Sequence, residues 1–297
     1  MAGLLIENAV DLHCHFSPDT LGFQATEAGL DLMTGTPVVE SARDALAQGQ
    51  AAVVLKSHSF SSAPLAKVLS EMFPDLRVYG GLCTDYYSGG LNVAAVDAAL
   101  AMGAKIVWLP TVHSAQDMST GGGATGFTGG GIAVVGEDGR PNDELKEIFS
   151  LISEHDAILA TGHVSADEHY AVGKEFAGRG KGLGTHAGEE IAGPKLTRQQ
   201  AVELADLGAT IEFTALCCTD ALGFKGKSAA ELSTWIAAVG PERCVLSSDL
   251  GFLKGVPAPV SGLHNFLERL WKEGVSEVDL SLMASRTPAR LLGLELS

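Results

Sequence analysis

Long apolar runs and an excess of positive charge are both missing from this 297-residue sequence. No run approaches the roughly 18 apolar residues that a membrane span needs. The first residues, MAGLLIENAVD, lack the basic segment of a signal peptide, so we expect a cytoplasmic protein. The 20 Lys and Arg against 36 Asp and Glu give a formal net charge of -16. This balance argues against a nucleic-acid partner and favours a small-molecule substrate.

Cysteine pairs and nucleotide-binding motifs are also missing. The five cysteines are odd in number, scattered and without a CxxC pair, so neither a disulfide framework nor a cysteine zinc cluster is indicated. They are expected to be reduced, mostly buried thiols. We find no P-loop and no GxGxxG opening the first helix, and no Pro-rich or charged linker divides the chain, which favours one domain over residues 1–297.

What recurs instead is a short apolar run followed by a helical pattern. Eight such units in series predict an α/β protein of the (β/α)8 type, a TIM barrel, because each near-continuous apolar strand needs helices on one side and packed side chains on the other. An open doubly wound sheet is the alternative. The runs are 9–15, 51–58, 77–84, 105–111, 158–163, 182–186, 210–214 and 244–249, and the helical stretches are 39–50, 63–73, 92–103, 142–155, 166–180, 197–208 and 228–240.

An insertion over about 114–141 interrupts the regular spacing after the fourth strand. Its first half, STGGGATGFTGG, is too rich in glycine for a fixed element, whereas GIAVVGEDGRP predicts a small hairpin with a turn at Asp138-Gly139. We interpret the insertion as a loop that acts as a lid over the mouth of the barrel. A disordered surface loop is the alternative.

Histidine or aspartate ends five of the eight runs, and four of these ends supply the expected metal ligands. Chemistry in such a barrel lies at the carboxyl ends of the strands, so these side chains should meet at one rim. His13 and His15 are two residues apart and should face the same side of their strand, with Asp11 one step deeper and Cys14 facing away. Nitrogen-rich ligation with an open position favours zinc, with manganese, iron and nickel as alternatives. The expected metal site comprises His13, His15, His163, His186 and Asp249.

These motifs together resemble the amidohydrolase superfamily of metal-dependent hydrolases. The resemblance rests on DLHCHFSPD, TGH, GTH and SSD after strands one, five, six and eight and on the closing SRTPARLLGLE, and it covers essentially the whole chain. It implies that His13, His15 and His163 bind metal. It also implies that His186 binds a second metal or polarises the substrate, and that Asp249 handles the proton of the attacking water.

One departure from that superfamily concerns the number of metal ions. Members with two ions commonly carry a carboxylated lysine or a glutamate at the end of strand four, where this chain has Leu109-Pro110-Thr111. One ion is therefore expected, with two as the alternative. Strand two ends in Lys56-Ser57-His58, and both Lys56 and His58 are candidate catalytic residues. Lys56 could be a displaced carboxylated bridge, a cation for a substrate carboxylate or oxyanion, or an internal ion-pair partner of Glu212.

Other polar residues near the strand ends are weaker candidates. Asp85, Tyr86, Tyr87 and His113 follow strands three and four and could contact substrate, whereas Glu189 and Glu190 could cap a helix or reach the metal. His155, His169 and His264 lie in helical patterns and are expected to be structural.

The expected function is hydrolysis, by a metal-activated water, of an amide, cyclic amide, lactone or related C–N or C–O bond in a small molecule. The main alternative is metal-dependent non-oxidative decarboxylation of a small unsaturated or aromatic acid. A nuclease or phosphoesterase and a non-catalytic metal-binding barrel are further alternatives. The sequence leaves open whether the chain forms a homo-oligomer.

Overall fold

A nearly closed ring of parallel strands forms the centre of the computed structural model, which describes residues 6–19, 35–121, 129–221, 223, 225–253 and 255–296. Eight strands pair in sequence order, each parallel to the next. This confirms the predicted TIM barrel. Six of the eight predicted runs contain their strand, and β4 and β6 each begin one residue before the predicted run. The strands are β1 (Val10–Cys14), β2 (Ala52–Leu55), β3 (Arg77–Cys83), β4 (Ala104–Trp108), β5 (Ile158–Ala160), β6 (Lys181–Gly184), β7 (Thr210–Thr214) and β8 (Cys244–Ser247).

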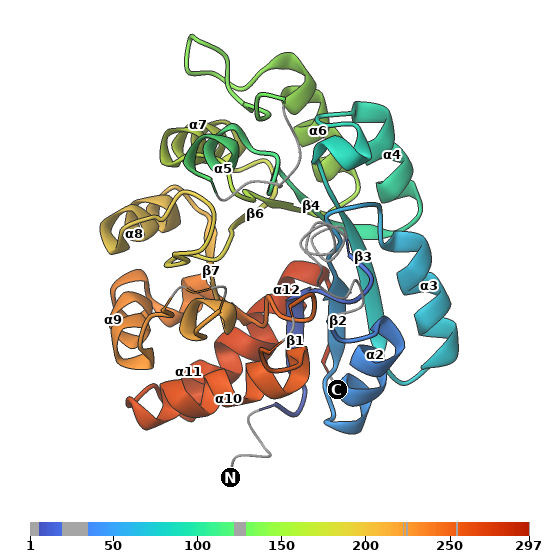
Figure 1. Cartoon of the computed structure of the whole chain (residues 1–297), viewed down its shortest axis with the longest axis vertical. Coiled ribbons are helices and arrows are strands. Elements are labelled where there is room, and N and C mark those ends of the chain that lie inside the picture. Colours follow the sequence, from blue (N-terminus) through green and yellow to red (C-terminus); the bar gives the residue numbers. More distant parts are fainter. Residues whose placement is uncertain are drawn as a thin grey trace.

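Helices surround the strands, as Figure 1 shows. Several begin at a side chain that accepts a hydrogen bond from the first turn, including Asn142, Ser165 and Thr197, as N-cap residues do. The helices are α2 (Val38–Ala47), α3 (Ala63–Met72), α4 (Val93–Ala101), α5 (Ala115–Thr120), α6 (Asp143–Glu154), α7 (Ala166–Phe176), α8 (Arg198–Asp206), α9 (Ala229–Val239), α10 (Pro259–Lys272), α11 (Glu277–Ser281) and α12 (Thr287–Leu292). Short helical turns are η2 (Tyr86–Ser88), η3 (Leu216–Cys218), η4 (Pro241–Arg243) and η5 (Leu282–Arg286).

The inside of the barrel is filled by apolar side chains rather than open. Leu12, Val54 and Ile106 belong to one buried cluster, which α12 joins through Leu291 and Leu292. Trp108 is the largest fully buried side chain in this cluster. A Cβ at Gly81 would lie 2.3 Å from the Trp108 ring, so only glycine leaves room for that indole. Trp108 therefore forms an apolar floor beneath the polar residues of the barrel mouth.

Strand β1 departs from regular alternation immediately before its histidines. Leu12 lies in the interior cluster, and the His13 ring centroid is also only 5.8 Å from that of interior Trp108. The pairing register with β2 shifts between Asp11 and Cys14, and such a bulge allows consecutive residues to face the same side. Asp11 accepts hydrogen bonds from the backbone N–H of His13 at 3.1 Å and of Ser248 at 3.0 Å. Its carboxylate thus fixes β1 to β8 where the barrel closes, a role that strand periodicity did not predict.

The insertion after β4 is described in part. Residues 122–128 of the predicted lid lie outside the described residues. In the rest, Val135 pairs antiparallel with Pro141, and the N–H of Gly139 bonds to the carbonyl of Gly136, in the place of the predicted hairpin. Helix α5 carries Asp117, which is fully buried, so this part of the insertion belongs to the body of the barrel. No described helix is long and apolar enough to cross a membrane.

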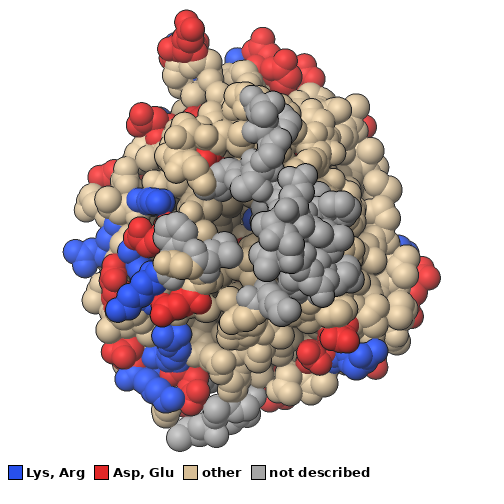
Figure 2. Space-filling model, in the orientation of Figure 1, with Lys and Arg blue, Asp and Glu red and all other residues tan. Residues whose placement is uncertain are grey.

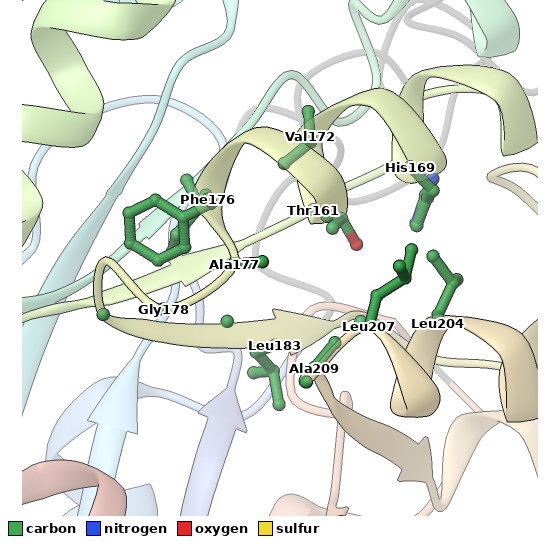
Figure 3. Close-up of a pocket in the computed structure, with 16 residues that line it drawn as sticks. Thr161, His169, Val172, Phe176, Ala177, Gly178, Leu183, Leu204, Leu207 and Ala209 are labelled. Carbon is green, nitrogen blue, oxygen red and sulfur yellow. The ribbon is translucent and has the colours of Figure 1, made fainter.

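A small cavity separates β6 from helices α7 and α8 (Figure 3). Its volume is about 40 Å³, and Gly182 and Gly184 of β6 line it because they contribute no side chain. His169 of α7 faces Leu204 and Leu207 across it. The ring donates through Nδ1 to the Ser165 carbonyl at 2.9 Å. Burial lowers the pKa of His169 to about 4, which makes it the structural histidine that its helical position predicts.

We expect His169 to make the folded state less stable in mild acid. The unfolded chain takes up this proton near the ordinary pKa of 6.5 and the folded protein only near 4, so stability falls as pH decreases between these values. The contribution of His169 changes the free energy of unfolding by at most about 1.4 kcal/mol per pH unit. Replacement of His169 by Gln removes this contribution. In urea unfolding, the stability difference between wild type and His169→Gln should shift in favour of the variant as pH is lowered from near 7 to near 5. A constant difference would contradict the assignment.

Candidate functional site

Three residues predicted as metal ligands meet at the mouth of the barrel. His13 lies in β1, His15 directly follows it, and Asp249 follows β8. Asp249 Oδ1 lies 2.9 Å from His13 Nε2 and 3.2 Å from His15 Nε2. Their ligating atoms all lie within 4.8 Å of one another, and each side chain is buried. Figure 2 shows a depression near the centre of this view, which coincides with the ring of strands in Figure 1.

Lys56, the residue after β2, is buried against the same histidine. Its Nζ lies 2.8 Å from His13 Nε2 and 5.5 Å from the centroid of the Trp108 ring, while only 1% of the residue is exposed. His13 Nε2 therefore faces a cationic side chain and the Asp249 carboxylate together. An ammonium and an Nε2–H cannot both donate across this contact, so Lys56 and Asp249 compete for the single in-plane bonding position of Nε2.

Glu212 of β7 connects two of the site histidines. Its Oε2 accepts from His13 Nδ1 at 3.1 Å and from the backbone N–H of His186 at 3.0 Å. Of the alternatives for Lys56, the ion pair with Glu212 is not found: the carboxylate meets His13 Nδ1, whereas the lysine meets Nε2 on the other edge of that ring. With Nδ1 donating to Glu212, Nε2 is the nitrogen of His13 that faces the site, where a bound cation would take the place of its proton.

The same arrangement of a buried carboxylate against Nδ1 of an imidazole occurs four times among the described residues. Sequence reasoning missed Asp19 and Asp117, and it assigned Asp85 to substrate contact. No periodicity could reveal such pairs, because the partners come from different segments. The pairs are Glu212 with His13 at 3.1 Å, Asp19 with His58 at 3.0 Å, Asp117 with His163 at 2.5 Å and Asp85 with His113 at 3.4 Å.

His163 and His186 lie beside the metal-ligand trio but are not part of it. Their ring centroids are 4.7 Å apart, and that of His186 is 6.1 Å from that of His13. Neither belongs to a group of three described residues whose ligating atoms lie within 4.8 Å. Asp117 holds His163 through Nδ1 and also accepts the Gly193 N–H at 2.7 Å. The insertion thus supplies the residue that orients His163.

Electrostatics keep the Asp249 carboxylate charged. Burial alone would raise its pKa, but the charge and hydrogen bond of His13 and the hydrogen bond of His15 outweigh burial and lower the pKa far below its ordinary value. For His13, burial and Lys56 are outweighed by Asp249 and Glu212, which raises the pKa to about 9. For His15 and His186 burial dominates and lowers the pKa, so these two imidazoles are neutral.

The weaker candidates have mainly structural contacts. Asp85 accepts the backbone N–H groups of Thr111 at 2.9 Å and His113 at 3.0 Å, which fixes the turn after β4. Tyr86 and Tyr87 pack edge-on against His113. Glu189 Oε1 accepts the backbone N–H groups of residues 190 and 191, while Glu190 pairs with Lys227 at 2.5 Å. His155 is the C-cap of α6, and His264 lies in α10.

A divalent cation fits the His13, His15 and Asp249 trio chemically. Two imidazoles and one carboxylate are a donor set of catalytic zinc sites, and Glu212 behind His13 is the typical support for such a ligand. Nδ1 of His15 and of His186 is buried and has no hydrogen-bond partner among the described residues. Among the described residues, the buried carboxylates at the mouth outnumber the one buried lysine, Lys56, and an added cation would balance that excess.

Comparison with known sequences identifies a family. The model described as "Family of unknown function (DUF6282)" matches residues 8–212. The chain belongs to DUF6282. None of the curated proteins compared with this DUF6282 member matches it.

Solved structures similar to this DUF6282 chain share its fold. An amidohydrolase from Pseudomonas aeruginosa superposes with a TM-score of 0.62 at 12% identity, covering 98% of both chains. A probable dipeptidase from the same organism gives 0.63 at 12% identity, covering 98% of this chain and 96% of the other. A putative 2-pyrone-4,6-dicarboxylic acid hydrolase from Pseudomonas putida gives 0.60 at 17% identity, covering 98% and 99%. The resemblance to amidohydrolases is thus confirmed for the fold.

We expect Gly162, directly before His163, to tolerate no side chain. Its φ is +60°, and an added Cβ would lie 2.2 Å from the Leu109 carbonyl oxygen. Gly162→Ala should lower the unfolding free energy by about 3 kcal/mol or more, since a left-handed alanine costs about 1–2 kcal/mol before any clash. Urea unfolding measures the loss.

Gly178→Ala is the matched control, because Gly178 has a φ of +73° and nothing within 4 Å of the added Cβ. The unfolding free energy of Gly178→Ala should fall only by the cost of the left-handed backbone conformation. Equal losses in the two variants would show that the contact with the Leu109 carbonyl is not decisive.

Proposed function

We propose that the protein is a metal-dependent hydrolase that cleaves an amide, cyclic amide, lactone or related C–N or C–O bond of a small molecule. The observation that carries this proposal is the convergence of His13, His15 and Asp249 at the mouth of the barrel, with Glu212 behind His13. The amidohydrolase, dipeptidase and pyrone hydrolase titles of structures with this fold support it. In this proposal His163 and His186 complete the ligand set or face the substrate.

A divalent ion at this site, zinc in our proposal, would lower the pKa of a bound water to about 7 and polarise the scissile carbonyl. Asp249 would accept the proton of the attacking water, since its carboxylate is ionised and its backbone N–H donates to the His13 carbonyl at 2.8 Å. It can return the proton to the leaving group.

Lys56 and His58, which follow β2, would lie beside the bound cation and the reacting substrate. Lys56 is placed to stabilise the developing oxyanion, because its Nζ is held 2.8 Å from His13 and is shielded from water. His58 is oriented by Asp19 at the same rim. We also propose a cytoplasmic location, supported by the five cysteines, all of which are free and buried.

Asp249→Asn should abolish most turnover while the fold persists. The amide fills the same volume but cannot take a proton, so we expect kcat to fall by about 10²–10⁴-fold. Turnover is measured against a panel of small amides, cyclic amides and lactones with zinc-loaded wild type and variant, and a thermal melt verifies folding. Full activity in the variant would exclude the assigned role. Reaction in H₂¹⁸O should place one ¹⁸O in the product, whereas release of CO₂ without incorporation would identify a decarboxylase instead.

Glu212→Gln should weaken cation binding without removing it. Glutamine still accepts from His13 Nδ1 but lacks the negative charge, and the loss of such support typically costs about 10–100-fold in affinity. Competition with a chromophoric zinc chelator measures the change. The matched control is Glu189→Gln, since Glu189 is also buried but accepts from the backbone N–H groups of residues 190 and 191 rather than from an imidazole. Equal weakening in both variants would contradict a specific role for Glu212.

A further inference from the structure

A second group of potential ligands lies next to the first and shares one residue with it. It consists of His15, Asp19 and His58, whose ligating atoms all lie within 4.8 Å of one another. At most 5% of any of the three residues is exposed. Asp19 follows the first strand and His58 follows the second, so this group lies on the β1–β2 side of the mouth, whereas Asp249 lies on the β8 side.

The second group has the same chemistry as the first. Each consists of two imidazoles and one carboxylate, a donor set that binds divalent transition-metal ions and leaves positions open for water or substrate. The carboxylate is firmly placed: Asp19 Oδ2 accepts the His58 N–H at 3.0 Å and the Ser57 hydroxyl at 3.3 Å, while Oδ1 lies 3.0 Å from His58 Nδ1.

His15 stands between the two groups with one ring nitrogen already used. Its Nε2 meets Asp249 Oδ1 at 3.2 Å, whereas its Nδ1 is buried and has no hydrogen-bond partner among the described residues. A buried ring nitrogen without a partner costs free energy, typically about 1–3 kcal/mol. A cation on the Asp19 side would satisfy that nitrogen.

The ring planes define the movement that binding would require. The His15 and His58 rings are nearly parallel, at 16° with centroids 4.7 Å apart, and Phe252 packs edge-on against both. Imidazole lone pairs lie in the ring plane, so the His58 ring must turn about its Cβ–Cγ bond to share a ligand with His15. That turn also frees Asp19 Oδ1 from His58 Nδ1 for ligation.

We propose that His15, Asp19 and His58 form a second divalent-cation site, with His15 bridging to the cation held by His13 and Asp249. To bridge, the His15 ring releases its remaining N–H proton to solvent and binds as an imidazolate, with Nε2 toward Asp249 and Nδ1 toward Asp19. This inference rests on the proposed function for the first cation. It differs from the two-ion centre that the amidohydrolase resemblance implies, which would use a residue at the end of strand four and His186. The mouth of the barrel would then present two cations to a substrate, one on each side of the His15 ring.

Cobalt(II) tests this proposal, since it replaces zinc and its visible absorption reports ligation. The chelator-stripped full-length chain is titrated with Co²⁺, and bound metal is counted by elemental analysis after gel filtration. We expect two equivalents in wild type and one in both His58→Gln and Asp19→Asn, with altered visible bands. His169→Gln, another buried histidine replaced by the same residue, should retain two. Thermal melts identify any variant that fails to fold, and the isosteric Asp19→Asn keeps the test valid if His58→Gln is unfolded.

The outcomes separate this inference from the proposed function. One equivalent in wild type, unchanged in His58→Gln and Asp19→Asn but lost in His13→Gln, would overturn the second site and leave the first in place. No bound cobalt in wild type would overturn both. Two equivalents that persist in His58→Gln and Asp19→Asn would place the second ion elsewhere and also overturn the inference.

Discussion

Ionised carboxylates inside a protein require a hydrogen-bond donor or a cation, and the mouth of this barrel buries several of them. The protein meets this requirement with imidazoles: Asp19, Asp85, Asp117 and Glu212 each lie against Nδ1 of a histidine. Because Nδ1 faces the carboxylate, Nε2 is the nitrogen of each ring that is left for another partner. One electrostatic constraint therefore fixes the orientation of each ring.

Backbone bonds between the strand ends keep this arrangement together. Asp11 receives the amides of His13 and Ser248, and the Asp249 amide donates to the His13 carbonyl. The loops that carry the proposed ligands are thus joined where the barrel closes. His186 and Asp249 adopt positive φ values of 35° and 55°, which aim their side chains away from the path of the preceding strand. His186 and Asp249 thus combine a left-handed backbone conformation with backbone hydrogen bonds to distant segments.

The strands and the convergence of His13, His15 and Asp249 could be predicted because both follow from local patterns. Apolar runs give the strands, and the rule that parallel strands end at one rim brings their last residues together. The carboxylate partners could not be predicted in this way. Asp19 and His58 are 39 residues apart and Asp117 and His163 are 46 apart, so the pairs appear only after the barrel has closed. The alternative of a Glu212–Lys56 ion pair is not found, because inward orientation alone does not say which neighbour a carboxylate meets.

The apolar floor made by Trp108 limits the routes by which molecules can enter and leave the site. Side chains fill the barrel below it, and α12 packs into the same cluster, so the barrel interior offers no passage. A molecule that reaches Lys56 and Asp249 enters and leaves through the same opening. Under the proposed function, the product must therefore leave before the next substrate can enter. A product that retains the group by which the substrate is recognised would act as a competitive inhibitor.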